Sequence, residues 1–168
     1  MPLLERLMHN WMSTSGEWLK RGLEERMGFG IDTSTAFGAE AVKRIEAQKL
    51  AWLTTVDSKG TPQPNPVWFI WDSDAIVIFS KPNQAKLKNI ARSGRVSLNL
   101  EATTDEEHIT IFTGHADIVD RATIGQDLLD RYAARYEEGM VNIKMTRAEY
   151  EAAYTEVIRF TPEKLRGW

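Results

Sequence analysis

A short segment, SKPNQAK, combines a hydroxyl group and two lysines with the expected start of a helix. The free backbone amides at a helix start and the helix dipole both favour a bound negative charge. Ser80, Lys81 and Lys86 therefore form a candidate phosphate site, and Lys88 and Arg92 add cations over the next turns. The alternative is a basic helix face that meets only solvent.

Three prolines alternate in the segment TPQPNPVWFIW, just before an aromatic run that is typical of a strand. Successive N–H groups along a strand point to opposite sides, so Pro62, Pro64 and Pro66 remove donors from one side only. The residues between them can still pair on the other side. The pattern predicts a strand with one open edge, which either protects against aggregation or receives a flat ligand against its backbone.

Other reactive side chains do not form a recognisable site. His108 and His115 are seven residues apart on one expected strand, hence on opposite faces, which disfavours a shared metal. The acidic residues 105–107 suit a polar loop better than a ligand set. The sequence has no cysteine, no evident serine–histidine–acid set and no glycine fingerprint for nucleotides. We therefore expect no metal site and assign no catalytic residue.

Composition limits the class of protein. The 168 residues have a net charge of −3 and a hydrophobic fraction of 42%, which suit one compact domain with an appendage. A general nucleic-acid binder would carry an excess of cations. No apolar run approaches the roughly 18 residues of a membrane span, and the start lacks the layout of a secretion signal. We expect a soluble cytoplasmic protein.

Residues 1–35 differ in texture from the rest and predict a helical arm. The apolar residues that recur at spacings of three and four are Leu3, Leu4, Leu7, Met8, Trp11, Trp18, Leu19, Leu23 and Met27. Such an arm can pack on its own body or on a partner subunit. A membrane-surface helix is the alternative, but the polar face mixes acidic with basic residues, so we do not expect membrane association.

The body, residues 36–168, alternates strand-like segments with turn signals. The expected strands are LAWLTTV, the proline-bearing run, AIVIFS, RVSLNLE, HITIFTGHADIV with a bend or bulge at Gly114, and EVIRF. Helices are expected over residues 38–49, from a cap at Asn83 to Gly94, over 121–138, and from a capping box at Thr146 and Glu149. The predicted fold class is mainly β: an antiparallel β-barrel with flanking helices.

The run from WLTTVDSKG to RVSLNL, with TGHADIV and IRFTPEKLRGW, resembles the pyridoxamine 5'-phosphate oxidase-like superfamily of split β-barrel flavoproteins. More narrowly, it resembles the branch of coenzyme F420-dependent reductases known from actinobacteria. The resemblance covers residues 36–168 and leaves out the arm. It implies a split β-barrel of the FMN- or F420-binding type, and a homodimer in which two subunits build each cofactor site at their interface.

The resemblance also implies two groups of cofactor-binding residues. Those that line the cofactor ring are Asn65, Pro66, Val67 and Trp68. Those that hold its phosphate are Ser80, Lys81 and Lys86. Among the tryptophans, Trp52, Trp68 and Trp71 are expected in the core, with one aromatic near the ring. Trp168 is expected at the dimer interface, and Arg166 is a candidate partner for an anionic coenzyme tail.

The implied function is that of an F420-dependent oxidoreductase, which transfers a hydride between the reduced deazaflavin and an organic small-molecule substrate. The missing cysteine and triad agree with chemistry supplied by a cofactor. FMN is the alternative cofactor of the same fold. A non-catalytic F420 carrier, or a haem-binding relative with His115 as ligand, is the alternative of another class. Substrate contacts are expected in residues 137–146.

Overall fold

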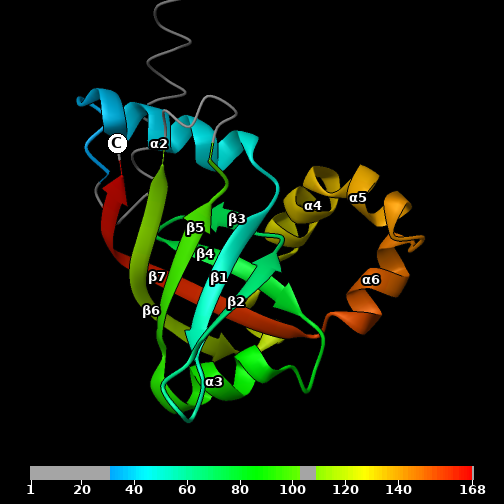
Figure 1. Ribbon diagram of the computed structural model, residues 1–168. Helices are drawn as coiled ribbons and strands as arrows, with labels where there is room; N and C mark the ends of the chain where they lie inside the picture. Colours follow the sequence, from blue (N-terminus) through cyan, green and yellow to red (C-terminus); the bar gives the residue numbers. More distant parts are fainter. Residues whose placement is uncertain (1–30, 103–108, 168) are drawn as a thin grey trace, which may run out of the picture.

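The computed structural model describes residues 31–102 and 109–167 (Figure 1). The predictions on the arm as far as residue 30, on His108 and the acidic residues before it, and on Trp168 lie outside these residues. Within them, seven strands form one antiparallel sheet. Their order is β2-β1-β5-β6-β7-β4-β3.

The strands are β1 (Ala51–Val56), β2 (Pro62–Val67), β3 (Ile70–Asp72), β4 (Ala75–Ser80), β5 (Arg95–Leu100), β6 (Thr110–Val119) and β7 (Glu156–Gly167). The helices are α2 (Ala36–Ala47), α3 (Ala85–Ser93), the short 3₁₀ helix η1 (Arg121–Thr123), α4 (Gln126–Arg135), α5 (Glu137–Asn142) and α6 (Arg147–Ala153). Helices α2 and α3 lie at opposite ends of the sheet, and α4 to α6 form an arc beside it (Figure 1).

The sheet closes on itself because its first and last strands are consecutive in the chain. Only Trp68 and Phe69 separate β2 from β3. Three Cα–Cα steps span at most about 11 Å, so the end of β2 must lie close to the start of β3. The predicted split β-barrel with flanking helices is therefore confirmed.

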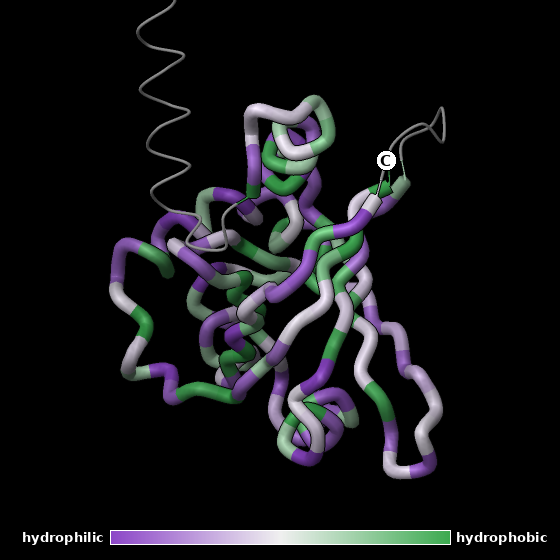
Figure 2. The backbone as a smooth tube through the Cα atoms, turned by 90° about the vertical axis from the view of Figure 1, so that its left-hand side faces the viewer, coloured by the Kyte–Doolittle hydropathy of each residue, from purple (hydrophilic) through white to green (hydrophobic). Residues whose placement is uncertain are grey.

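The burial pattern of each strand depends on whether one or both of its faces are covered by other elements. The strand β5 alternates between buried and partly exposed residues, whereas every residue of β4 is buried. In β4, Ile76 and Ile78 face the barrel interior, while Val77 and Phe79 pack under α4 to α6. A strand covered on both sides needs a continuous apolar run, which AIVIFS supplies. Figure 2 shows such hydrophobic stretches in green through the centre of the molecule.

Local signals in the sequence fix several element ends. The predicted capping box of Thr146 and Glu149 opens α6. Gly94 ends α3 with a left-handed φ of 67°. The predicted bulge at Gly114 is present as a register shift between β6 and β7. Pro162 of β7, which has no N–H to donate, lies opposite Gly114 at this same irregular point. A missing donor costs least where the ladder is already interrupted.

Three local predictions are wrong. The N-cap of α3 is Gln84, while Asn83 adopts φ 62° in the turn before it, a conformation that asparagine tolerates. The helix predicted over 121–138 is divided into η1, α4 and α5, because Asp120 caps η1 and Gly125 begins a new helix. The last strand is much longer than EVIRF, because residues 161–167 continue its ladder with β6.

None of the helices in the described ranges has the length and apolar character needed to cross a membrane.

Candidate functional site

The strand β2 has an open edge. It ends the sheet order and, among the described strands, pairs with β1 alone. In an antiparallel ladder the N–H and C=O of one residue point to the same neighbour, so the residues between the prolines bond to β1. The carbonyls of Pro62, Pro64 and Pro66 then point to the open side, which offers acceptors without donors. The predicted open edge is confirmed.

The residues predicted to line a flat ring do not share one face of β2. Asn65 lies opposite the buried Leu53, whereas Pro66 lies opposite Trp52 on the outer face. Val67 is buried. A planar group that contacts all of these residues must therefore lie across the edge and meet the backbone.

Trp52 is a residue that the sequence reasoning misjudged. We expected it in the core, but it is 41% exposed on the outer face of β1. The alternation of AWLTTV carries the signal, because Leu53 and Trp52 must point to opposite faces. Trp52 therefore adds an exposed aromatic surface beside Pro66.

The side chain of Trp68 is packed among the helices. Its ring stacks on Tyr136 at 4.7 Å between centroids and lies 5.4 Å from Tyr150. Gly139 of α5 lies so close that an added Cβ would come within 2.8 Å of the indole Cζ2. Trp71, by contrast, packs against the barrel core, as expected. The backbone of Trp68, rather than its ring, is the part that continues the open edge.

The start of α3 has the properties of an anion site. Its N-cap, Gln84, forms no side-chain hydrogen bond to the first-turn amides. Lys86 is half-buried, forms no ion pair with any described carboxylate, and its pKa is lowered because burial disfavours the charged amine. The segment from Ala75 to Leu100 contains five basic residues and no acidic one.

The other predicted phosphate residues differ in accessibility. Ser80 is 1% exposed and its hydroxyl donates to the Lys81 carbonyl at 3.1 Å, so it is not directed to solvent. Lys81 is exposed. Arg92 donates to the Val56 carbonyl and to Asn89, which holds α3 against β1. Lys81 and Lys86 are thus the cations best placed for a ligand.

A row of aromatic rings connects the two predicted groups. The Lys81 Nζ lies 5.3 Å from the centroid of the Tyr154 ring. Tyr154 stacks on Tyr150 at 4.0 Å, and Tyr150 lies next to Trp68. The structure therefore brings Lys81 and the end of β2 to the same side of the barrel.

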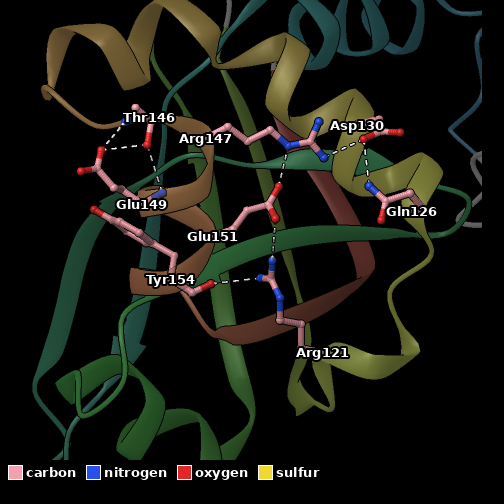
Figure 3. A network of polar contacts seen from close by, with 8 residues as sticks. All are labelled: Arg121, Gln126, Asp130, Thr146, Arg147, Glu149, Glu151 and Tyr154. Atoms are coloured by element: carbon pink, nitrogen blue, oxygen red, sulfur yellow. Dashed lines mark hydrogen bonds and ion pairs between the residues drawn. The ribbon is translucent and has the colours of Figure 1, made fainter.

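A polar network holds α6 in this position (Figure 3). Arg147 bonds to Asp130 of α4 and to Glu151, each at 2.6 Å. Arg121 donates to the Tyr154 carbonyl at 3.2 Å and pairs with Glu151 at 3.8 Å. The Arg147 contact is the main cause that lowers the pKa of Asp130. Exposed pairs stabilise little one by one, but this network fixes Tyr154 in place.

His115 is partly exposed, and its Nε2 lies 3.2 Å from an Asp117 oxygen. In the described ranges no cluster of three potential metal ligands occurs.

The family model described as pyridoxamine 5'-phosphate oxidase matches residues 37–168. No curated protein is significantly similar in sequence. Solved structures share the fold at low identity. An F420 reductase is 23% identical with a TM-score of 0.60, covering 74% of this chain and 94% of its own. A putative pyridoxamine 5'-phosphate oxidase from Listeria innocua is 16% identical with a TM-score of 0.57, covering 77% and 95%. An FAD-binding protein from Mesorhizobium loti is 15% identical with a TM-score of 0.61, covering 77% and 90%.

Proposed function

Because the chain belongs to the pyridoxamine 5'-phosphate oxidase family, we propose that it is an oxidoreductase that binds coenzyme F420 and transfers a hydride between this deazaflavin and an organic substrate. The observation on which this proposal depends is the start of α3, which has no side-chain cap and where the half-buried Lys86 and the exposed Lys81 lie. FMN, which has a phosphate at a similar distance from its ring, is the second candidate.

The surroundings of Lys86 at the start of α3 suit a bound phosphate better than contact with solvent alone. A charged amine that is partly removed from water is unfavourable unless an anion binds it. None of the ion pairs among the described residues includes Lys86. The first turn of α3, which has no side-chain cap, adds amide donors at the same end of the helix. Ser80 would need to rotate out of its buried position to take part.

The protein itself would bind the cofactor, orient it and shield it from water. When bound, the deazaflavin would supply the hydride chemistry. Lys81, Lys86 and the α3 amides would hold its phosphate. The open edge of β2, with the carbonyls of Pro64 and Pro66, would accept hydrogen bonds from ring N–H groups. Trp68 would contribute through its backbone, since its indole packs on Tyr136.

We also propose that the barrel domain, residues 36–168, forms a homodimer with the site at its border. The outer face of β2, β1, β5 and β6 has no described helix in front of it (Figure 1). Most of the outward residues in register on this face are uncharged: Pro64, Pro66, Trp52, Thr54, Ser97, Asn99, Ile111 and Thr113. The charged Arg95, at the start of β5, forms an ion pair with Glu163. A twofold interface pairs a face with its own copy, so a largely uncharged face limits like-charge repulsion.

The cofactor assignment is tested by titration of the purified protein with coenzyme F420 and with FMN, followed by quenching of tryptophan fluorescence. We expect tighter binding of F420. Clearly tighter binding of FMN would reverse the order of the two candidates. The catalytic part is tested with the reduced coenzyme and a panel of enones and quinones. A protein that binds F420 but oxidises its reduced form with no member of the panel would be a carrier.

A further inference from the structure

One buried hydroxyl contacts the backbone just before β1 and just after β2, at the end of this hairpin away from its turn. The Phe69 N–H donates to the Tyr136 hydroxyl at 2.8 Å. The same oxygen lies 2.6 Å from the Phe69 carbonyl and 2.9 Å from the Lys49 carbonyl. Lys49 comes two residues before β1, and Phe69 comes two residues after β2. The hydroxyl thus joins the segment that enters β1 to the segment that leaves β2.

Phe69 needs this partner. It is fully buried in the gap between β2 and β3, where no ladder partner is present among the described strands. A buried backbone group without a hydrogen bond costs about 1 to 3 kcal/mol. A tyrosine hydroxyl can accept the N–H and donate its single proton to one carbonyl at a time. Tyr136 therefore replaces the missing strand neighbour of Phe69.

The Tyr136 ring is itself held firmly. It is 1% exposed and stacks on Trp68 with a 4° angle between ring planes. The neighbouring Arg135 donates to the carbonyls of Ile45, Glu46 and Gln48, which fixes the end of α4 to the segment before β1. Burial raises the pKa of the Tyr136 hydroxyl, so it stays protonated and remains a donor at neutral pH.

We infer that Tyr136 is a positioning residue for the strand that receives the cofactor ring. The open edge of β2 has no neighbouring strand to fix it, so the place of its last residues depends on β1 and on the Tyr136 hydroxyl. The binding of a cofactor at this strand rests on the proposed function. The ordering of Phe69 by the Tyr136 hydroxyl does not depend on any ligand.

The test compares Tyr136→Phe with Tyr132→Phe in the full chain. Tyr132 is also buried and lies in the same aromatic cluster, but its hydroxyl bonds to that of Tyr150 at 2.9 Å. Both variants lose one buried hydroxyl, so both should lose stability. Only Tyr136→Phe should accelerate hydrogen exchange of the Phe69 amide in the ligand-free protein. Only this variant should also weaken F420 binding, by about three- to tenfold. The analogue 4-aminophenylalanine at position 136, which keeps a donor and acceptor, should restore protection.

Unchanged Phe69 protection in Tyr136→Phe, or an equal loss of affinity in both variants, would overturn the inference. Fast exchange of the Phe69 amide in the wild-type protein would overturn it without any variant, even if Tyr136→Phe failed to fold. A wild-type protein that bound neither F420 nor FMN would refute the proposed function instead. The exchange of Phe69 would then decide by itself whether the hydroxyl orders the strand.

Discussion

Burial of the Lys86 side chain lowers its pKa because the charged amine loses contact with water. Its pKa in the folded protein therefore lies below that of the unfolded chain. Between the two values the unfolded chain binds more protons, so the free energy of unfolding should rise with pH in the interval just below the usual lysine value. Below that interval the lysine is charged in both states and its desolvation opposes folding.

Replacement of the amine should therefore separate stability from binding. Lys86→Met keeps the apolar stem, so chemical denaturation at pH 7 should give an unfolding free energy equal to or above that of the wild type, without the rise at high pH. F420 affinity should fall by about 1 to 3 kcal/mol, the usual loss for a charge-assisted contact. Lys88→Met, at an exposed position of the same helix, is the control and should change neither stability nor its pH dependence. A parallel loss of stability and affinity would contradict an anion site.

Gly139 shows a different constraint, the close approach of a helix to an aromatic ring. Gly139→Ala would place a Cβ 2.8 Å from the Trp68 indole, which is confined by two tyrosines. Such overpacking typically costs about 1 to 3 kcal/mol in the free energy of unfolding. In a Trp68→Leu background the same change should cost much less, since the indole is gone. Equal costs in both backgrounds would show that the contact is not the cause.

The residues of the proposed phosphate site that can be picked out from the sequence belong to one local motif. Lys81 and Lys86 stand out because a basic segment and a helix start are adjacent in the chain. The part played by Tyr136 could not be predicted, because its hydroxyl meets residues 67 and 87 positions away. In the sequence it is only one residue of the helix expected over 121–138. The burial of Ser80 was likewise hidden, since it depends on the strand β7 beside β4.

At the scale of elements, Arg135 joins α4 to the end of α2. Its guanidinium donates to the carbonyls of Glu46 at 2.7 Å, of Ile45 at 3.0 Å and of Gln48, groups that have no partner within the helix itself. It also lies 5.5 Å from the centre of the Phe69 ring. One planar group therefore supports the segment that leads into β1.

Arg135→Lys should lower the free energy of unfolding by about 1 to 3 kcal/mol, because a single amine cannot reach three carbonyls in this arrangement. Arg131→Lys, on the same helix, is the matched control. Arg131 pairs with the partly exposed carboxylate of Asp72 and the exposed carboxylate of Asp127, so its loss should stay below about 1 kcal/mol. Urea denaturation of both variants checks the difference, and a similar cost for the two would argue against the role of Arg135.

Elements whose signals are local were predicted well. The alternation of RVSLNL, the capping box of α6 and the bulge at Gly114 each depend on a few neighbouring residues. The single helix expected over 121–138 was wrong because apolar periodicity continues across the breaks at Gly125 and Tyr136. The proline pattern predicted the open edge correctly, since missing donors are a property of the sequence itself.

At the scale of the whole molecule, the largely uncharged outer face of the sheet leads to a prediction on assembly. Trp52→Glu would bring two like charges together across a twofold interface, because the same face is used by both copies. We expect the dimer to dissociate, as measured by sedimentation. Ile118→Glu, at an aliphatic of similar exposure near the end of β6, is the control and should remain dimeric. A wild-type protein that is monomeric at high concentration would refute the homodimer directly.

The last strand of the chain, β7, lies in the middle of the sheet between β6 and β4. Until it is made, the hairpin of β3 and β4 shares no ladder with the other four strands. A ribosome adds residues from the N-terminus onward at about 5 to 20 per second, so barrel closure must wait until β7 has been made. Translation that stops before Glu156 should yield a product with two unmatched sheet edges, suited to capture by chaperones or proteases rather than to partial activity.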